Sequence, residues 1–111
     1  MARQTIACGD CFRWAGKYII DHPNDTLVHG TVKAVFNNER RYPHAWVETD
    51  TNRVLDWQSI VAGYGGNFVI PGQGYNIDDF YELYTPKKIT PYTSREAIRA
   101  MVSNSHWGPW K

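Results

Sequence analysis

The sequence predicts an α+β domain in which an N-terminal helix carrying a cysteine packs on an antiparallel β-sheet, followed by a C-terminal helix. Three observations indicate this class. An apolar pattern with helical spacing begins at Cys11, strand-forming segments separated by turn residues occupy 26–57, and Thr93-x-x-Glu96 has the spacing of a helix capping box. At 111 residues, the chain is expected to form one compact domain over 1–111.

The first helix is expected to begin at Asp10 as N-cap and to end at Asp21 and Pro23. Cys11 would then lie in its first turn, where free backbone N–H groups and the helix dipole favour a thiolate and the exposed Cys11 amide can donate to an oxyanion. The alternative is that Cys11 is a small buried apolar residue. The core-facing stripe of the helix consists of Cys11, Trp14, Ala15, Tyr18 and Ile19.

A strand is predicted over 26–36, with Gly30 marking a bulge or a close backbone approach. His29 lies in this strand. We expect it to be a solvent-facing or hydrogen-bonded core histidine rather than a second active-site imidazole. The segment NNERR at 37–41 is predicted to be a polar turn with solvated arginines.

The stretch YPHAWVETDTNRVLDW at 42–57 is predicted to be a β-hairpin. Side chains of a strand alternate between faces, so His44, Trp46 and Glu48 share one face. If the numbers of paired residues add to about 100 or 102, with a loop near 49–52, Asp56 lies opposite or diagonal to His44 and within reach of a hydrogen bond. A register shifted by one residue would send Asp56 to the other face.

The second half of the chain carries weaker signals. The glycine-rich segment 59–73 lacks the residue order of a phosphate loop and is expected to be a loop near the site. Residues 77–83 can form a short helix or lead into a strand, and 81–89 are predicted to be an extended or edge segment, with Lys87 and Lys88 as solubilising charges.

The final helix is predicted to run from Thr93 to about Ser103. Its apolar stripe of Ile98, Met101 and Val102 is expected to pack on the sheet. The aromatic tail at 106–110 should fold back onto the domain.

Composition excludes several classes of protein. The formal net charge of +1 gives no strong case for nucleic acid or an anionic membrane as partner. There is no apolar run of about 20 residues and no apolar N-terminal segment of signal-peptide length, which predicts a soluble, cytoplasmic protein. Five Trp and seven Tyr suit either an aromatic core or an aromatic groove.

The two cysteines, Cys8 and Cys11, form the motif CGDC. Structural zinc would need two more ligands, and no metal is expected because the histidines show no ligand-like spacing. A C-x-x-C pair at a helix start can form a reversible disulfide, but the βαβ context usual for that motif is missing. The histidines available as zinc ligands are His22, His29, His44 and His106.

Four segments carry a family resemblance: GDCFRWA, LVHGTV, HAWVE and VLDW, in this order over residues 9–57. Together they resemble the core of the transglutaminase-like branch of the papain-like cysteine hydrolase and transferase superfamily, small members of which occur in bacteria and phages. The resemblance implies a papain-like fold, with Cys11 as nucleophile, His44 as general base and later acid, and Asp56 as orienting carboxylate. The sequence departs from the family in its compressed helix-to-hairpin segment and in Trp57-Gln58, where a proline-bearing stretch often follows the aspartate.

The implied chemistry needs no cofactor. His44 takes the proton of Cys11, Asp56 holds the imidazole tautomer, and the thiolate attacks an amide or ester carbonyl to form a thioester. The substrate can be a peptide, a protein or a small amide, and transfer is as compatible as hydrolysis. His106 is a weaker choice for the imidazole. Further candidates are Gln4 and Gln58 as oxyanion donors, and Trp14, Trp46 and Trp57 as groove or core residues near the site.

Three function classes therefore stand: a cysteine hydrolase or acyl transferase, a catalytically silent peptide-binding or protein-binding module of the same fold, and a CxxC redox or metal protein.

Overall fold

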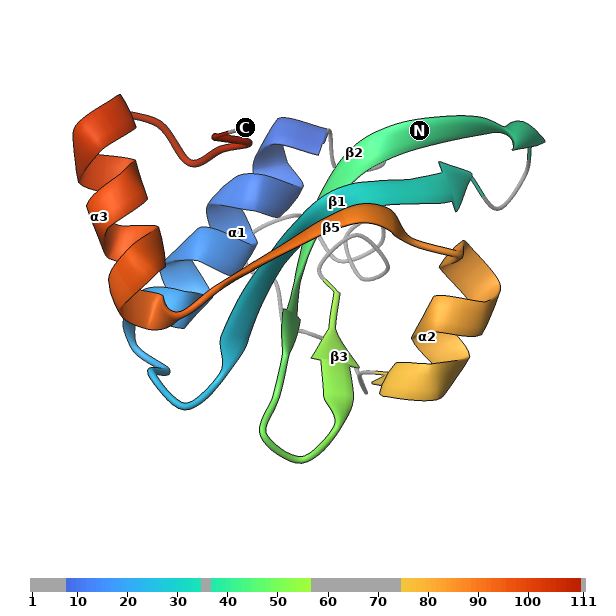
Figure 1. The fold of residues 1–111 in the computed structure, drawn as a ribbon, viewed down its shortest axis with the longest axis horizontal. Coiled ribbons are helices and arrows are strands. Elements are labelled where there is room, and N and C mark those ends of the chain that lie inside the picture. Colours follow the sequence, from blue (N-terminus) through green and yellow to red (C-terminus); the bar gives the residue numbers. More distant parts are fainter. Residues whose placement is uncertain (1–7, 35–36, 57–74, 111) are drawn as a thin grey trace, which may run out of the picture.

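The computed structural model describes residues 8–34, 37–56 and 75–110. These form an α+β fold, in which a five-stranded antiparallel sheet has the strand order β4-β3-β2-β1-β5 (Figure 1). The predicted fold class is confirmed at this level, since the helix that carries Cys11 packs on β2. The elements are α1 (Cys8–Ile20), β1 (Thr26–Ala34), β2 (Asn37–Glu48), β3 (Arg53–Leu55), β4 (Tyr75–Asn76), α2 (Ile77–Tyr84), β5 (Lys87–Tyr92) and α3 (Ser94–Asn104).

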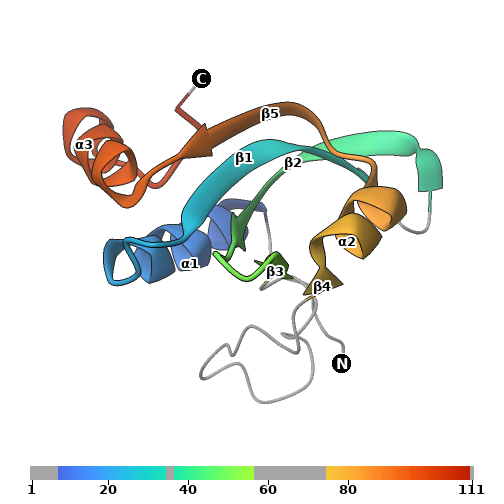
Figure 2. The same cartoon turned by 60° about the horizontal axis from the view of Figure 1, so that its bottom comes forward.

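The helices lie at the two ends of the sheet. Figures 1 and 2 show α1 and α3 side by side at one end and α2 at the other, with the long strands β1 and β2 running between them. None of the described helices combines the length and the apolar character that crossing a bilayer requires.

Buried side chains form two clusters, because neighbouring residues of a strand point to opposite faces of the sheet. The cluster beneath α1 and α3 consists of Cys11, Phe12, Ala15, Ile19, Leu27, Ala45, Val47 and Ala97. The cluster beneath α2 consists of Val28, Val32, Trp46, Val54 and Phe80.

Helix α1 begins at Cys8, so the prediction of Asp10 as N-cap is wrong. Asp10 is instead the third residue of the helix. The helix ends as predicted, with the Asp21 N–H donating to Tyr18 O at 3.2 Å.

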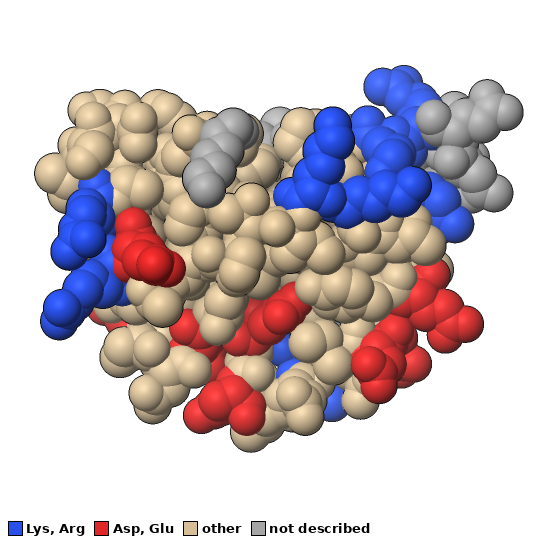
Figure 3. All heavy atoms as spheres, viewed as in Figure 1, with Lys and Arg blue, Asp and Glu red and all other residues tan. Residues whose placement is uncertain are grey.

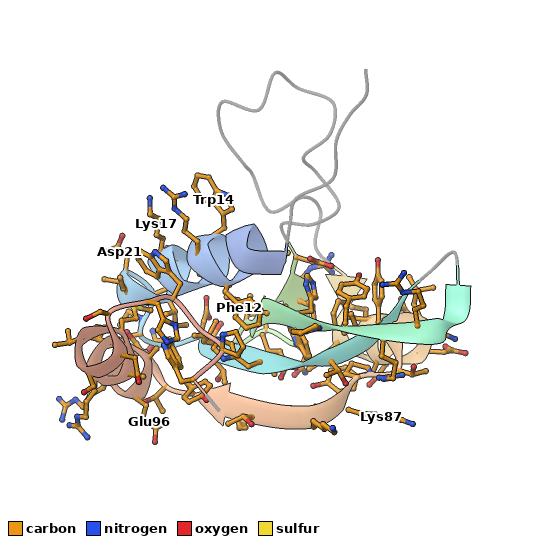
Figure 4. The ribbon with its side chains drawn as sticks, turned by 90° about the horizontal axis from the view of Figure 1, so that it is seen from above. Phe12, Trp14, Lys17, Asp21, Lys87 and Glu96 are labelled. Carbon is orange, nitrogen blue, oxygen red and sulfur yellow. The ribbon has the colours of Figure 1, made fainter. Side chains whose placement is uncertain are left out.

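The buried side of α1 is also rotated from the predicted stripe. Phe12 is buried, whereas Trp14 is only half-buried and points away from the sheet, with the Lys17 ammonium 5.3 Å from the centre of its ring (Figure 4).

The predicted polar turn at 37–41 is wrong, because β2 already begins at Asn37. Arg41 pairs with Lys33 in the β1–β2 ladder, and its guanidinium donates to Thr31 O at 3.1 Å and to both oxygens of Thr85. Arg41 therefore joins two strands to the end of α2 instead of lying in solvent. A polar run can continue a strand when a neighbouring strand satisfies its backbone groups.

Gly30 has the role predicted for it. The β1–β5 register shifts between His29 and Thr31, and a Cβ at Gly30 would lie 3.0 Å from Lys87 O and 3.1 Å from the Trp46 ring. Only glycine allows these groups to approach so closely.

Residues 77–84 form α2, so the helical alternative is confirmed and the extended reading of 81–84 is wrong. The Asn76 side chain caps the helix by accepting from Asp78 N at 2.9 Å. Strand β5 then begins at Lys87 and lies at the edge of the sheet, as predicted.

Helix α3 begins with the predicted capping box. Glu96 N donates to Thr93 Oγ1 at 3.1 Å, and Thr93 N donates to Glu96 Oε1 at 2.9 Å. The predicted packing face is wrong in part: Met101 packs against the cluster beneath α1, whereas Ile98 and Val102 are 39% and 76% exposed.

Small residues, Ser94 and Ala97, lie inward on α3 instead. Their size lets α3 approach α1, where a Cβ at Gly16 would lie 3.1 Å from the Met101 methyl group. The tail folds back as predicted, with Trp107 and Trp110 against the cluster beneath α1.

Candidate functional site

The β2–β3 hairpin has the predicted register. Val47 pairs with Leu55 and Glu48 with Val54, so the numbers of paired residues add to 102. The turn is closed by Thr49 N donating to Arg53 O at 2.8 Å, and Asn52 takes a left-handed conformation with φ 64°. This register directs Asp56 to the same face as His44.

His44 and Asp56 form a buried hydrogen bond. Nε2 of His44 lies 3.0 Å from Oδ1 of Asp56, and the two side chains are 1% and 2% exposed. An ionised carboxylate can only accept, so Nε2 carries the hydrogen, and in the neutral ring Nδ1 keeps its lone pair. This Nδ1 is buried and has no hydrogen-bond partner within the described part of the chain.

Aromatic side chains surround the His44 ring. The ring centres of Tyr42 and Trp46 each lie 5.9 Å from that of His44. Trp46 is fully buried against Phe80, and its Nε1 donates to Glu48 Oε2 at 3.0 Å. Trp46 is therefore a core residue and not a groove wall.

Cys11 is the fourth residue of α1 and is only 1% exposed. The expectation of an exposed Cys11 amide is wrong, since the residue as a whole is buried. Its neighbours in the core include Ala45 and Val47 of β2, and Ala45 directly follows His44.

The orientation of α1 follows from its other contacts. Phe12 faces β1, with its ring centre 4.7 Å from that of His29. Tyr18 lies two turns after Cys11 on the same side of the helix. Its hydroxyl donates to the Asp25 carboxylate, and this carboxylate also accepts from Asp50 N in the β2–β3 turn. The side of α1 that carries Cys11 therefore faces the β2–β3 hairpin.

Cys11 and His44 approach β2 from different faces. Cys11 belongs to the same buried cluster as Ala45, whereas the His44 side chain leaves the strand on the Trp46 side. Within the described residues, β3 pairs with β2 only at Val47 and Glu48, so beside His44 the strand is paired on one side alone, with β1 at Gly30. The structure thus joins His44 to Asp56 directly and places Cys11 in the buried cluster to which Ala45, the residue after His44, also belongs.

Several predicted site residues lie outside the described residues. They are Gln4, Trp57, Gln58 and the glycine-rich segment 59–73. The side chain of Cys8 is likewise not described, which leaves the redox reading without structural support.

Across 8–34, 37–56 and 75–110, no group of three His, Cys, Asp or Glu side chains is arranged to hold a metal ion. His22 stacks on Tyr18 with ring centres 3.7 Å apart. His106 lies in the tail, where its Nδ1 accepts from Gly108 N at 3.0 Å. Neither histidine is placed with Asp56.

His29 is a buried histidine of a kind that the sequence did not predict. It is 5% exposed, and neither ring nitrogen has a hydrogen-bond partner in the described part of the protein. Burial lowers its pKa to about 4. In β1, His29 lies two positions after the buried Leu27 and so on the same face, a spacing that could have indicated its burial. That its ring nitrogens lack a polar partner depends on the tertiary fold.

No family model, curated protein or solved structure matches this chain. The likeness to the transglutaminase-like branch therefore rests on the motifs within residues 9–57.

Proposed function

We propose that the protein is a cysteine-dependent hydrolase or acyl transferase that acts on amide bonds through Cys11, His44 and Asp56. The buried hydrogen bond between His44 Nε2 and Asp56 Oδ1 carries the proposal, because it leaves Nδ1 as an unprotonated base.

The reaction follows from these groups. Nδ1 of His44 takes the proton of the Cys11 thiol, and the resulting thiolate attacks the carbonyl carbon of the substrate. The tetrahedral intermediate collapses to a thioester as the imidazolium returns the proton to the leaving amine. Water or a second amine, deprotonated by the same imidazole, then releases the acyl group and restores the thiol.

The order of elements also supports a papain-like core of the transglutaminase type. A helix carries the cysteine, the next long hairpin carries the histidine on β2, and the aspartate directly follows β3. This order matches the family's motifs, in which thiol, imidazole and carboxylate come from a helix start, a strand and the end of the following strand.

Thiol labelling tests the proposal. With iodoacetamide near neutral pH, Cys11 should react as a single fast thiol, so the fast phase should disappear in Cys11→Ser and persist in Cys8→Ser. His44→Ala should slow this phase about tenfold or more, because an unassisted thiol with a pKa near 8.5 is only a few per cent thiolate at pH 7. His22→Ala, at an exposed histidine, is the matched control and should leave the rate unchanged.

Two outcomes would count against an enzyme: equally slow labelling of both cysteines, and a fast phase that survives His44→Ala. Either would indicate that the imidazole does not activate the sulfur.

One observation favours a catalytically silent binding module as the second candidate. Cys11, His44 and Asp56 are all at most 2% exposed, so a substrate carbonyl reaches them only if the surrounding residues move. In such a module, His44 and Asp56 would fasten the hairpin, and labelling of Cys11 would be slow and independent of His44. The labelling series above therefore separates the two functions.

A further inference from the structure

A hollow lies beside Phe12 of α1. It is a cavity of about 180 Å³ between α1, β1, β2, β5 and the C-terminal tail, and His29, Phe12, Pro43, Lys88, Tyr92 and Pro109 are among its lining residues. None of Cys11, His44 or Asp56 lines it. Its role is therefore separate from that of the proposed triad.

Two residues that line this cavity carry three polar atoms that are buried without hydrogen-bond partners in the described structure: both ring nitrogens of His29 and the hydroxyl of Tyr92. His29 is 95% buried, and its ring packs among Phe12, Tyr92 and Trp110. Buried polar groups of native proteins are nearly always paired, so three unpaired atoms around one hollow need an explanation. A bound polar group would supply their partners.

The lining indicates the charge of that group. Of the described residues around the cavity, Lys88 alone carries a formal charge, and no carboxylate is among them. Figure 3 shows Lys and Arg atoms gathered at the upper right, above the start of β5, with acidic atoms below them over α2 and a second basic group over α3. This distribution favours an anion over a cation.

The lining also indicates the size and polarity of the ligand. Phe12, Pro43 and Pro109 present apolar surface, and Figure 4 shows Phe12 directed from α1 toward the strands. The volume is below the roughly 300 Å³ at which pockets for drug-sized ligands begin. We propose that this cavity binds a small carboxylate with an apolar body, with His29 and Tyr92 donating hydrogen bonds to the carboxylate and Lys88 supplying the opposite charge.

The protonation of both donors suits this role. Near neutral pH the His29 ring is uncharged, since burial lowers its pKa, and it offers one N–H. Burial and the nearby Glu96 raise the pKa of Tyr92, so its hydroxyl keeps its hydrogen.

Benzoate is the probe for this site, and benzyl alcohol and benzylamine are its neutral and cationic counterparts. In a ¹H–¹⁵N titration, benzoate should move the amide signals of Gly30, Thr90 and Tyr92 saturably, while the other two compounds bind at least tenfold more weakly. Lys88→Gln should weaken benzoate binding about tenfold, and Tyr92→Phe should weaken it several-fold. Lys87→Gln is the matched control, because this adjacent lysine is not among the lining residues.

Three results would overturn the proposal: no saturable shift with benzoate, equal binding of benzyl alcohol, or an equal effect of Lys87→Gln and Lys88→Gln. Cys11→Ser and His44→Ala should both retain benzoate binding. The carboxylate site and the proposed enzyme can therefore fail independently.

Discussion

His29 is the residue whose burial is least compensated. Its ring touches three aromatic side chains, and neither nitrogen finds a partner in the described structure. The protonated form would bring a charge into this apolar surrounding, and its pKa falls to about 4 for that reason. The folded protein consequently binds a proton at His29 far less readily than the unfolded chain does.

This difference predicts a loss of stability in acid. Between pH 6.5, the unfolded pKa, and pH 4, the unfolded chain holds the extra proton, so stability at neutral pH is lost as the pH falls through this window. The contribution of His29 should reach about 3 kcal/mol and change little below pH 4. Urea unfolding at a series of pH values measures it.

His29→Phe should reduce the acid-induced loss of free energy of unfolding relative to the original protein. His22→Ala should keep the loss, because that histidine is exposed. If His29→Phe and the original protein lose stability in parallel between pH 6.5 and 4, His29 does not titrate as its burial requires.

At the level of single elements, helix starts and the hairpin turn depend on short-range hydrogen bonds. In α3, Thr93 and Glu96 satisfy each other's backbone N–H groups, and in α2 Asn76 does so for Asp78. Such bonds involve residues two or three positions apart, which is why the capping box of α3 could be predicted from the sequence. The packing faces of the same helices depend on which neighbours they meet.

The capping box of α3 should contribute measurably to stability. Thr93→Ala removes the side-chain acceptor and should lower the free energy of unfolding by about 1 kcal/mol. Chemical denaturation followed by circular dichroism measures the change. Thr93→Ser keeps the acceptor and should cost much less, so equal losses in the two variants would contradict a capping role.

For the whole molecule, the C-terminal tail joins elements that are distant in the sequence. Trp107 lies so close to α1 that a Cβ on Gly16 would come within 2.8 Å of its ring. Trp110 packs against His29 of β1 and Tyr92 of β5, with ring centres 4.8 and 5.0 Å away, and donates to His106 O. The tail thus covers one end of the core.

Removing residues 106–111 should therefore destabilise the domain by about 2–3 kcal/mol, the order expected for exposing the apolar surface of two half-buried tryptophans. The urea midpoint of the truncated chain measures the loss. Val102→Ala is the control, since Val102 is 76% exposed and should change stability by less than about 0.5 kcal/mol. An unchanged midpoint after truncation would mean that the tail packs without contributing to stability.

The amino-acid order by itself determined the features that depend on local rules. Strand alternation and turn residues set the register that joins His44 to Asp56, the capping residues set the start of α3, and Gly30 marked the close approach of β5. Each rule acts between neighbours in the chain or across one turn, so the pattern is visible without the fold.

Only the tertiary structure decided which surfaces meet. The small residues of α3 lie inward because α1 approaches closely there, Arg41 is held because Thr85 comes within its reach, and His29 is sealed by the tail. These contacts join segments tens of residues apart, and local patterns carry no information on how such segments pack. The burial of Cys11 is likewise decided by contacts between distant segments. The accessibility of the proposed nucleophile therefore also depends on the tertiary structure.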